Sequence, residues 1–256
     1  MTQFILPLIF GALIGLSLGL VGGGGSILAV PILVYAIGQP AHVATTTSLA
    51  IVGANALVGV IGHARSENVL LKTGLAFGAA GFLGAVAGTS LNRRVPGQLL
   101  LALFAFVMLA AAAAMLRKRS DTQVATGGED YDARGWRKLV LSGLGTGLMT
   151  GFFGVGGGFV IVPALVLILG LPMRAAGGTS LLIIALNSAS GLIARLGSGG
   201  LDWGVTLLFI LGGAVGVAFG VRLAGRLPQR RLTQAFAGLI VLVAAYVLYR
   251  SYLGMA

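Results

Sequence analysis

Long apolar segments alternate with short polar or glycine-rich breaks along almost the whole chain. The first half contains five such segments, at residues 4–21, 26–37, 45–62, 70–91 and 98–116. A membrane-crossing helix needs about 20 residues, so the last three segments are long enough to span. The 12 residues of 26–37 would reach only ~18 Å, roughly half of a bilayer core of about 30 Å. This pattern predicts a polytopic helical membrane protein.

The second half repeats the first half at an offset of 132 residues. Gly19–Pro31 (GLVGGGGSILAVP) aligns with Gly151–Pro163 (GFFGVGGGFVIVP). About 36 of roughly 106 gap-free aligned positions are identical, where composition alone would give on the order of 12. We therefore predict a duplicated chain. Its parts are a first membrane repeat at 1–116, a cytoplasmic linker at 117–138 and a second membrane repeat at 139–256.

Each repeat is predicted to hold three long transmembrane helices and a glycine-tipped pair of shorter segments. The pair either forms a re-entrant hairpin or crosses twice, which gives about 8–10 membrane segments in all. In both cases the number of crossings per repeat is odd, and an odd number inverts the second repeat relative to the first. If the pair instead formed a single interrupted crossing, the number of crossings per repeat would be even and the two repeats would be parallel. The fold class that we predict is an all-α integral membrane protein with two inverted-topology repeats.

The charge distribution favours the inverted arrangement. The chain has 17 Lys and Arg against 6 Asp and Glu, a net charge of +11. With the linker inside, an inverted topology leaves only Arg93, Arg94, Arg195 and Arg250 outside, a split of 13 to 4, whereas a parallel topology splits 10 to 7. Cytoplasmic loops are enriched in basic residues. Both termini are therefore expected on the extracytoplasmic side, and the charge needs no nucleic-acid partner.

Composition excludes several other classes of protein. With 57% apolar and 9% charged residues, the chain is not a soluble globular protein. It has no Cys and two widely spaced His residues, so we expect no metal and no cofactor. All six carboxylates fall in the linker or in short loops, which disfavours intramembrane carboxylate relays and cation sites. No nucleophile–base pair is visible, so an enzyme is not expected. The first segment lacks a basic leader and is expected to be retained.

The chain has 43 glycines, and two groups of them are expected to have different structural roles. Glycines spaced by three and four, as in Gly11, Gly15 and Gly19, favour close helix packing. Consecutive glycines cannot hold a regular helix well, and a helix break at membrane depth can aim backbone N–H groups at an anion. Close packing is the alternative for these two tips as well. The candidate tip residues are Gly22, Gly23, Gly24, Gly25, Gly154, Gly156, Gly157 and Gly158.

Polar side chains recur at the start of the third segment of each repeat. They line a path through the bundle, or they cap and connect helices. The candidate substrate-binding residues are Thr46, Thr47, Ser48 and Asn55 in the first repeat and Thr179, Ser180 and Asn187 in the second. Basic groups at equivalent positions are candidates for charge attraction or gating, with interfacial snorkelling as the alternative. These groups are His42, His63, Arg174 and Arg195.

The duplicated glycine–proline motif, followed by TTTS in one half and GGTS in the other, resembles the sulfite exporter TauE/SafE family of membrane transporters. The resemblance covers nearly the whole chain, and both copies carry the motif. It departs from symmetry where Gly23 aligns with Val155 and Ser26 with Gly158. The resemblance implies a transporter of small sulfur-containing anions, of the sulfite, thiosulfate or organosulfonate class, in a bacterial inner membrane.

The two repeats together suggest a substrate site near the midplane, with alternating access produced by rocking of one repeat against the other. The alternatives are an anion channel of the same fold and a transporter of a non-sulfur small organic anion. The predicted partners are a small anion and the lipid bilayer. The sequence leaves the coupling ion, the direction of transport and the oligomeric state open.

Overall fold

The computed structural model describes residues 2–65, 68–92, 97–117, 133–153, 158–193 and 202–252. Within these ranges the chain forms ten α-helices and one π-helical turn and no strand, which confirms the all-α prediction. Five of the helices in the described ranges are long and apolar enough to cross a membrane. These candidate spans are Val43–Ala64, Leu71–Gly88, Met173–Ile193, Trp203–Arg226 and Gln229–Tyr249.

Every predicted apolar segment is helical, and the second segment of each half is short. The helices of the first half are α1 (Thr2–Val21), α2 (Gly24–Pro31) continued by the π-helical turn η1 (Ile32–Ala36), α3 (Ala41–Ala64), α4 (Leu71–Asn92) and α5 (Gly97–Arg117). The helices of the second half are α6 (Ala133–Phe153), α7 (Gly158–Leu167), α8 (Met173–Ile193), α9 (Trp203–Arg226) and α10 (Gln229–Tyr252).

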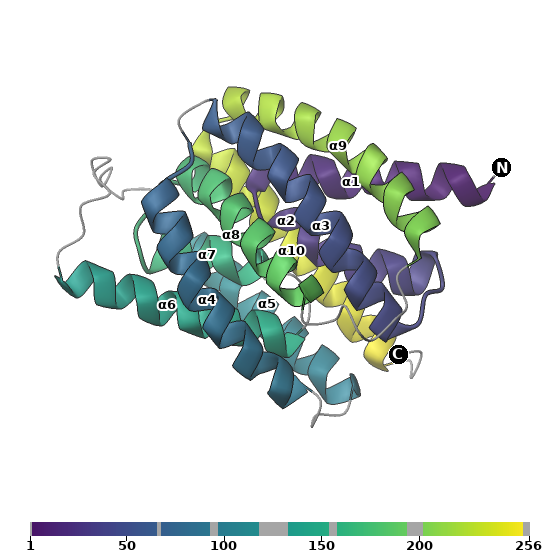
Figure 1. Cartoon of the computed structure of the whole chain (residues 1–256), viewed down its shortest axis with the longest axis horizontal. Helices are drawn as coiled ribbons and strands as arrows, with labels where there is room; N and C mark the ends of the chain where they lie inside the picture. The colour runs from purple at the N-terminus through teal and green to yellow at the C-terminus, as the bar shows by residue number, and fades with distance from the viewer. Residues whose placement is uncertain are drawn as a thin grey trace.

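Two helix pairs pack with their backbones in direct contact, α1 along α9 and α4 along α6 (Figure 1). A Cβ added at Gly15 would overlap the backbone of Gly213, and one added at Gly147 would overlap that of Gly81. The packing role expected for glycines at this spacing is therefore confirmed. We call these two interfaces the glycine seams. Their glycines are Gly11, Gly15, Gly19, Gly212, Gly213, Gly216 and Gly220 in one seam and Gly81, Gly84, Gly88, Gly143, Gly147 and Gly151 in the other.

The contacts along a seam also give the direction of its helices. Gly11 faces Phe209 and Gly19 faces Val217, so both residue numbers increase together and α1 runs parallel to α9. The other seam has the same sense, since Gly84 faces Leu144 and Gly88 faces Leu148. Shifted by 132 residues, α1 corresponds to α6 and α4 to α9, so the two seams are equivalent contacts between the halves.

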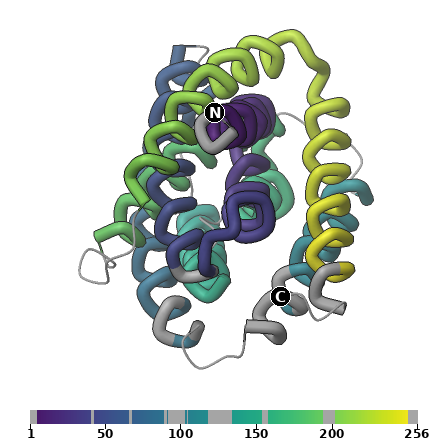
Figure 2. Tube along the Cα trace, turned by 90° about the vertical axis from the view of Figure 1, so that its right-hand side faces the viewer, coloured from purple at the N-terminus to yellow at the C-terminus, as the bar shows by residue number. Residues whose placement is uncertain are grey.

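The central pair, α3 and α8, runs in opposite directions. Gly53 faces Ser188, Gly59 faces Leu181, and Gly191 faces Leu49, so one number rises as the other falls. α3 and α8 are themselves equivalent under the 132-residue shift. The short α2 and α7 contact this pair and each other, and α2 is seen end-on near the middle of the bundle in Figure 2.

The outward faces of the helices are strongly apolar. Leu83, Phe106, Phe219 and Leu242 are each 60–70% exposed. A large exposed apolar surface is typical of contact with lipid or with another protein. The interior, by contrast, holds many fully buried apolar side chains, including Phe77, Phe159, Phe209 and Phe236.

Candidate functional site

The first glycine tip, Gly22–Gly25, is a break between two helices. α1 ends at Val21, and α2 begins at Gly24. Gly22 lies between them with φ +83°, in the left-handed region where glycine is strongly preferred. A Cβ at Gly22 would also overlap the backbone of Gly177 and lie 2.5 Å from the Ser180 hydroxyl of α8. The predicted helix break is thus observed, and it is buried against helix α8 of the other repeat.

The described parts of the two tips touch each other. A Cβ added at Gly23 would overlap the carbonyl of Gly158, and one at Gly158 would lie 2.5 Å from the Ser26 hydroxyl. The Ser26 hydroxyl donates a hydrogen bond of 2.8 Å to the Gly23 carbonyl. Ser26 and Gly158 are equivalent positions, so a second serine at 158 would have no room. Packing therefore explains this departure from symmetry. The other candidates in the second tip, Gly154, Gly156 and Gly157, lie outside the described residues.

The repeated Thr-Ser pairs differ in their bonding. Both serines bond within their own helix: Ser48 donates to the Thr45 carbonyl at 2.9 Å, and Ser180 to the Gly177 carbonyl at 2.8 Å. The Thr179 hydroxyl accepts a hydrogen bond of 3.0 Å from the Leu70 backbone N–H. Its equivalent, Thr47, is fully buried, and its hydroxyl finds no partner among the described residues. Thr46 is also buried in α3.

Asn55 and Asn187 are buried near the crossing of α3 and α8. Asn55 faces Gly213 of the first seam, and Asn187 faces Gly81 of the second, which are equivalent contacts. Both amide atoms of Asn55, and the carbonyl oxygen of Asn187, have no hydrogen-bond partner among the described residues. A buried amide without a partner is costly, so these positions are expected to serve more than packing.

The two basic candidates that the structure describes, His63 and Arg174, bond to backbone carbonyls of different helices. The His63 ring is buried, and its Nε2 lies 3.0 Å from the Gly19 carbonyl, close to the first tip. Because a carbonyl only accepts, this geometry assigns the proton to Nε2. Arg174 donates to the carbonyls of Gly225 and Leu227 at the end of α9, at 3.3 and 2.8 Å. The side chain of His42 and the whole of Arg195 lie outside the described residues.

Several residues at this site were missed by sequence reasoning. Gly177, Gly213 and Gly81 supply the surfaces against which the tip and the two asparagines pack. Ser188, buried beside Gly53 and without a partner in the described part of the chain, was also missed. The 132-residue repeat marked Gly81 and Gly213 as an equivalent pair, but only the helix register shows that an asparagine faces each of them.

The chemistry available here is that of hydrogen-bond donors and amides. Among the described residues no group of three His, Cys, Asp or Glu side chains could hold a metal ion. Asp202 is the one carboxylate side chain in the described ranges, and it caps the N-terminus of α9 instead of lying at the tips. Backbone N–H groups, hydroxyls and amides suit a small polar solute better than bond-making chemistry.

Comparison with known proteins agrees with this architecture. The profile of the family described as sulfite exporter TauE/SafE matches residues 7–247. A probable membrane transporter protein of Xylella fastidiosa is 38% identical, covering 94% of both chains. The probable membrane transporter protein YdhB of Bacillus subtilis is 28% identical over 90% of this chain and 96% of its own. The chain is a multi-pass membrane protein and belongs to the sulfite exporter TauE/SafE family, whose members are membrane transporters and not enzymes.

Proposed function

We propose that this protein transports a small sulfur-containing oxyanion, of the sulfite, thiosulfate or organosulfonate class, by alternating access. The observation that carries the proposal is the meeting of Gly23 with Gly158 beside the buried Ser180 hydroxyl. At this junction the N-terminus of α2 begins at a helix break. Helix N-termini with free N–H groups favour anions, and no carboxylate lies in the described parts of the spans.

The inverted repeat is part of the proposal, and helix directions support it. α1 and α4 are the first and fourth segments of their repeat, and an odd-crossing repeat orients them oppositely. α9 runs parallel to α1, and α6 runs parallel to α4. The first segment of repeat two therefore points opposite to the first segment of repeat one. The equivalent helices α3 and α8 run in opposite directions, as inversion requires, whereas parallel repeats would orient them alike.

The proposed domain plan and orientation rest on this inversion and on charge. Repeats at 1–116 and 139–256 flank a cytoplasmic linker at 117–138, in a bacterial inner membrane. Both termini lie on the extracytoplasmic side, because that orientation leaves only four of the 17 Lys and Arg outside. Protease or tag accessibility at each terminus checks the orientation, and a cytoplasmic N-terminus would refute it.

In this proposal the two tips and the α3–α8 crossing form one path. The backbone N–H groups of Gly23–Gly25 contact the anion, while Gly22 donates its own N–H to the Leu18 carbonyl and turns the chain beside Ser180. The unpartnered Asn55 amide, the Asn187 side chain and the Thr47 hydroxyl supply further bonds as the repeats rock. His63, bonded to Gly19 beside the tip, orients that segment. The residues Gly154, Gly156 and Gly157 complete the second tip.

The sulfur-containing class comes from the description of the matched family as sulfite exporters. The experiment is uptake into proteoliposomes of radiolabelled sulfite and thiosulfate, and of organosulfonates and small carboxylates as competitors. We expect saturable sulfur-oxyanion flux with counterflow. Flux that does not saturate and shows no counterflow would indicate a channel of the same fold. Competition by carboxylates alone would replace the sulfur class with an organic anion.

A further inference from the structure

The turns that follow α2–η1 and α7 share one backbone geometry but carry different side chains. Gly38 (φ +80°) and Gly170 (φ +73°) are equivalent positions in the left-handed conformation. In both turns the next residue donates its N–H back to the helix, Gln39 to the Leu33 carbonyl at 2.9 Å and Leu171 to the Leu165 carbonyl at 3.0 Å. This turn resembles a Schellman turn widened by one residue, and in a Schellman turn the residue after the glycine is commonly apolar and packs on the helix end.

Leu171 follows that rule, and Gln39 does not. Both side chains are buried, 8% exposed for Leu171 and 9% for Gln39. Neither amide atom of Gln39 has a hydrogen-bond partner among the described residues. Because leucine satisfies the same turn in the other repeat, the fold does not require a carboxamide here. A buried amide that packing does not require, and that lacks partners, points to a ligand.

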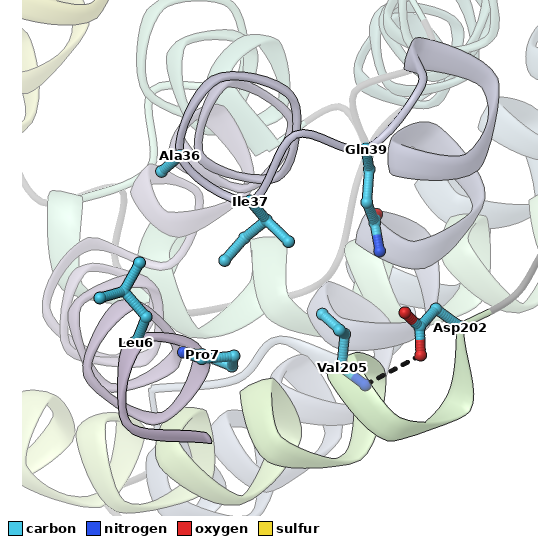
Figure 3. Close-up of a pocket in the computed structure, with 7 residues that line it drawn as sticks. All are labelled: Leu6, Pro7, Ala36, Ile37, Gln39, Asp202 and Val205. Atoms are coloured by element: carbon cyan, nitrogen blue, oxygen red, sulfur yellow. Dashed lines mark hydrogen bonds between the residues drawn. The ribbon is translucent and has the colours of Figure 1, made fainter. Parts of the chain in front are cut away.

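A cavity lies directly in front of the Gln39 amide (Figure 3). Its volume is about 520 Å³, and it is bounded by the beginnings of α1 and α9 and by the end of η1. Figure 3 shows the Gln39 amide and the Asp202 carboxylate pointing toward one another across this space. The lining residues are Leu6, Pro7, Ala36, Ile37, Gln39, Asp202 and Val205.

The polar groups around this cavity favour positive charge. One Asp202 oxygen accepts a hydrogen bond of 3.1 Å from the Val205 N–H, and the carboxylate has a second oxygen. Ala36 and Ile37 belong to the C-terminal end of the α2–η1 helix, where unpaired carbonyls give partial negative charge. Among the described residues of the lining, Asp202 is the one with a charged side chain. At the 132-residue offset Asp202 corresponds to Leu70 and Gln39 to Leu171, and neither leucine carries a charge or an amide.

We propose that Gln39 and Asp202 form a binding site for a small monovalent metal cation of the sodium type. Hard cations take carboxylate, carbonyl and water oxygens, and the carbonyls at helix ends commonly serve sodium in transporters. A single carboxylate balances one positive charge and not two. The site lies between Gln39 of the first repeat and Asp202 of the second, and the equivalent position formed by Leu171 and Leu70 lacks these polar groups. The proposed topology places the site on the extracytoplasmic side.

This site deepens the proposed function and rests on it for its role. A cation that moves with an oxyanion reduces the net negative charge that crosses, so the membrane potential opposes entry of the anion less. The cation site and the anion path are separate parts of the structure. Binding of the cation can therefore be measured without any knowledge of the anion.

The test is binding of radioactive sodium to the purified full-length protein in detergent, with unlabelled sodium, potassium and choline as competitors. The wild-type protein is expected to show one saturable class of sites that choline does not displace. Asp202→Asn keeps a good helix cap but removes the charge. Gln39→Leu reproduces the residue that the fold accepts at 171. Because affinity at oxygen sites depends on ligand charge and number, each variant should weaken sodium binding by about tenfold or more.

Leu171→Gln is the matched control, since it places a carboxamide in the same turn without a carboxylate partner, and its sodium binding should equal that of the wild type. Sodium should raise the melting temperature of the wild type and of this control but not of the two site variants. Absence of saturable sodium binding in the wild type, or binding that survives both site variants, overturns the proposal. Anion flux without sodium binding refutes this site alone, and sodium binding without any anion flux refutes only the proposed transport function.

Discussion

The glycine seams and the first glycine tip use the same residue for opposite purposes. Along the seams glycine sits inside regular helix and lets two backbones touch. At the tip, Gly22 has a positive φ and stops one helix so that another can start. A seam glycine has helical backbone angles that any residue can adopt, so only the neighbouring helix prevents a larger side chain there. Gly22 is restricted both by its neighbours and by its own positive φ. Glycine content alone therefore does not identify a binding site.

The largest effect is expected at the centre of a seam. Gly15→Ala and Gly147→Ala each place a Cβ into the backbone of the facing helix. Overpacking of this kind costs about 1–3 kcal/mol or more, and backbone cannot move aside as a side chain can. We expect a large loss of monodisperse protein and a lower melting temperature in detergent. Gly145→Ala is the control on the same helix, because its added Cβ meets nothing within 4 Å. Equal losses of yield and melting temperature in Gly145→Ala and Gly147→Ala would contradict the close backbone contact described for this seam.

A comparable effect with an additional cause is expected at the tip. Gly22→Ala combines a strained φ with a clash against Gly177, while Gly38→Ala and Gly170→Ala introduce the strained φ in open space. The left-handed conformation alone costs about 1–2 kcal/mol. The melting temperature of Gly22→Ala should therefore be well below those of the other two variants. If all three unfold at the same temperature, the tip is not packed as described.

The equivalent glycines Gly81 and Gly213 should differ in how strongly their replacement by alanine lowers stability. A Cβ at Gly213 would overlap the Asn55 amide, whereas a Cβ at Gly81 would lie 3.5 Å from the Asn187 amide, an ordinary contact. Gly81→Ala should therefore be nearly neutral, and Gly213→Ala should be destabilising. Melting temperatures of the two variants check this ranking, and the reverse order would show that the asparagines are misplaced.

The smallest effect on stability is expected where the effect on transport is greatest. Asn55→Leu and Asn187→Leu remove buried side chains in which both amide atoms of Asn55 and the carbonyl oxygen of Asn187 make no hydrogen bond within the described chain. Replacement by an apolar group of similar shape is often near neutral for folding. We expect a free energy of unfolding within about 1 kcal/mol of the wild type and a severe loss of oxyanion flux in proteoliposomes. Normal flux in both variants would remove the asparagines from the proposed path.

Much of this fold could be predicted because the relevant signals are local. Apolar segment length predicted the helices, including the short α2 and α7, since burial in lipid demands a minimum length. The three- and four-residue glycine spacing predicted close packing, since that spacing places glycines on one face of a helix. The repeat predicted which residues correspond, and Ser48 and Ser180 do make the same bond in both halves.

Partner choice could not be predicted, because it depends on the register between segments far apart in the chain. No local sequence pattern indicates that α1 packs on α9, that Asn55 faces Gly213, or that the Arg174 guanidinium binds the end of α9. The sequence by itself determined the helices, the duplication and the two kinds of glycine position. Only the tertiary structure decided which glycines meet, and it set the Gln39 amide opposite the Asp202 carboxylate, because these side chains come from turns that approach one another only after the helices have packed.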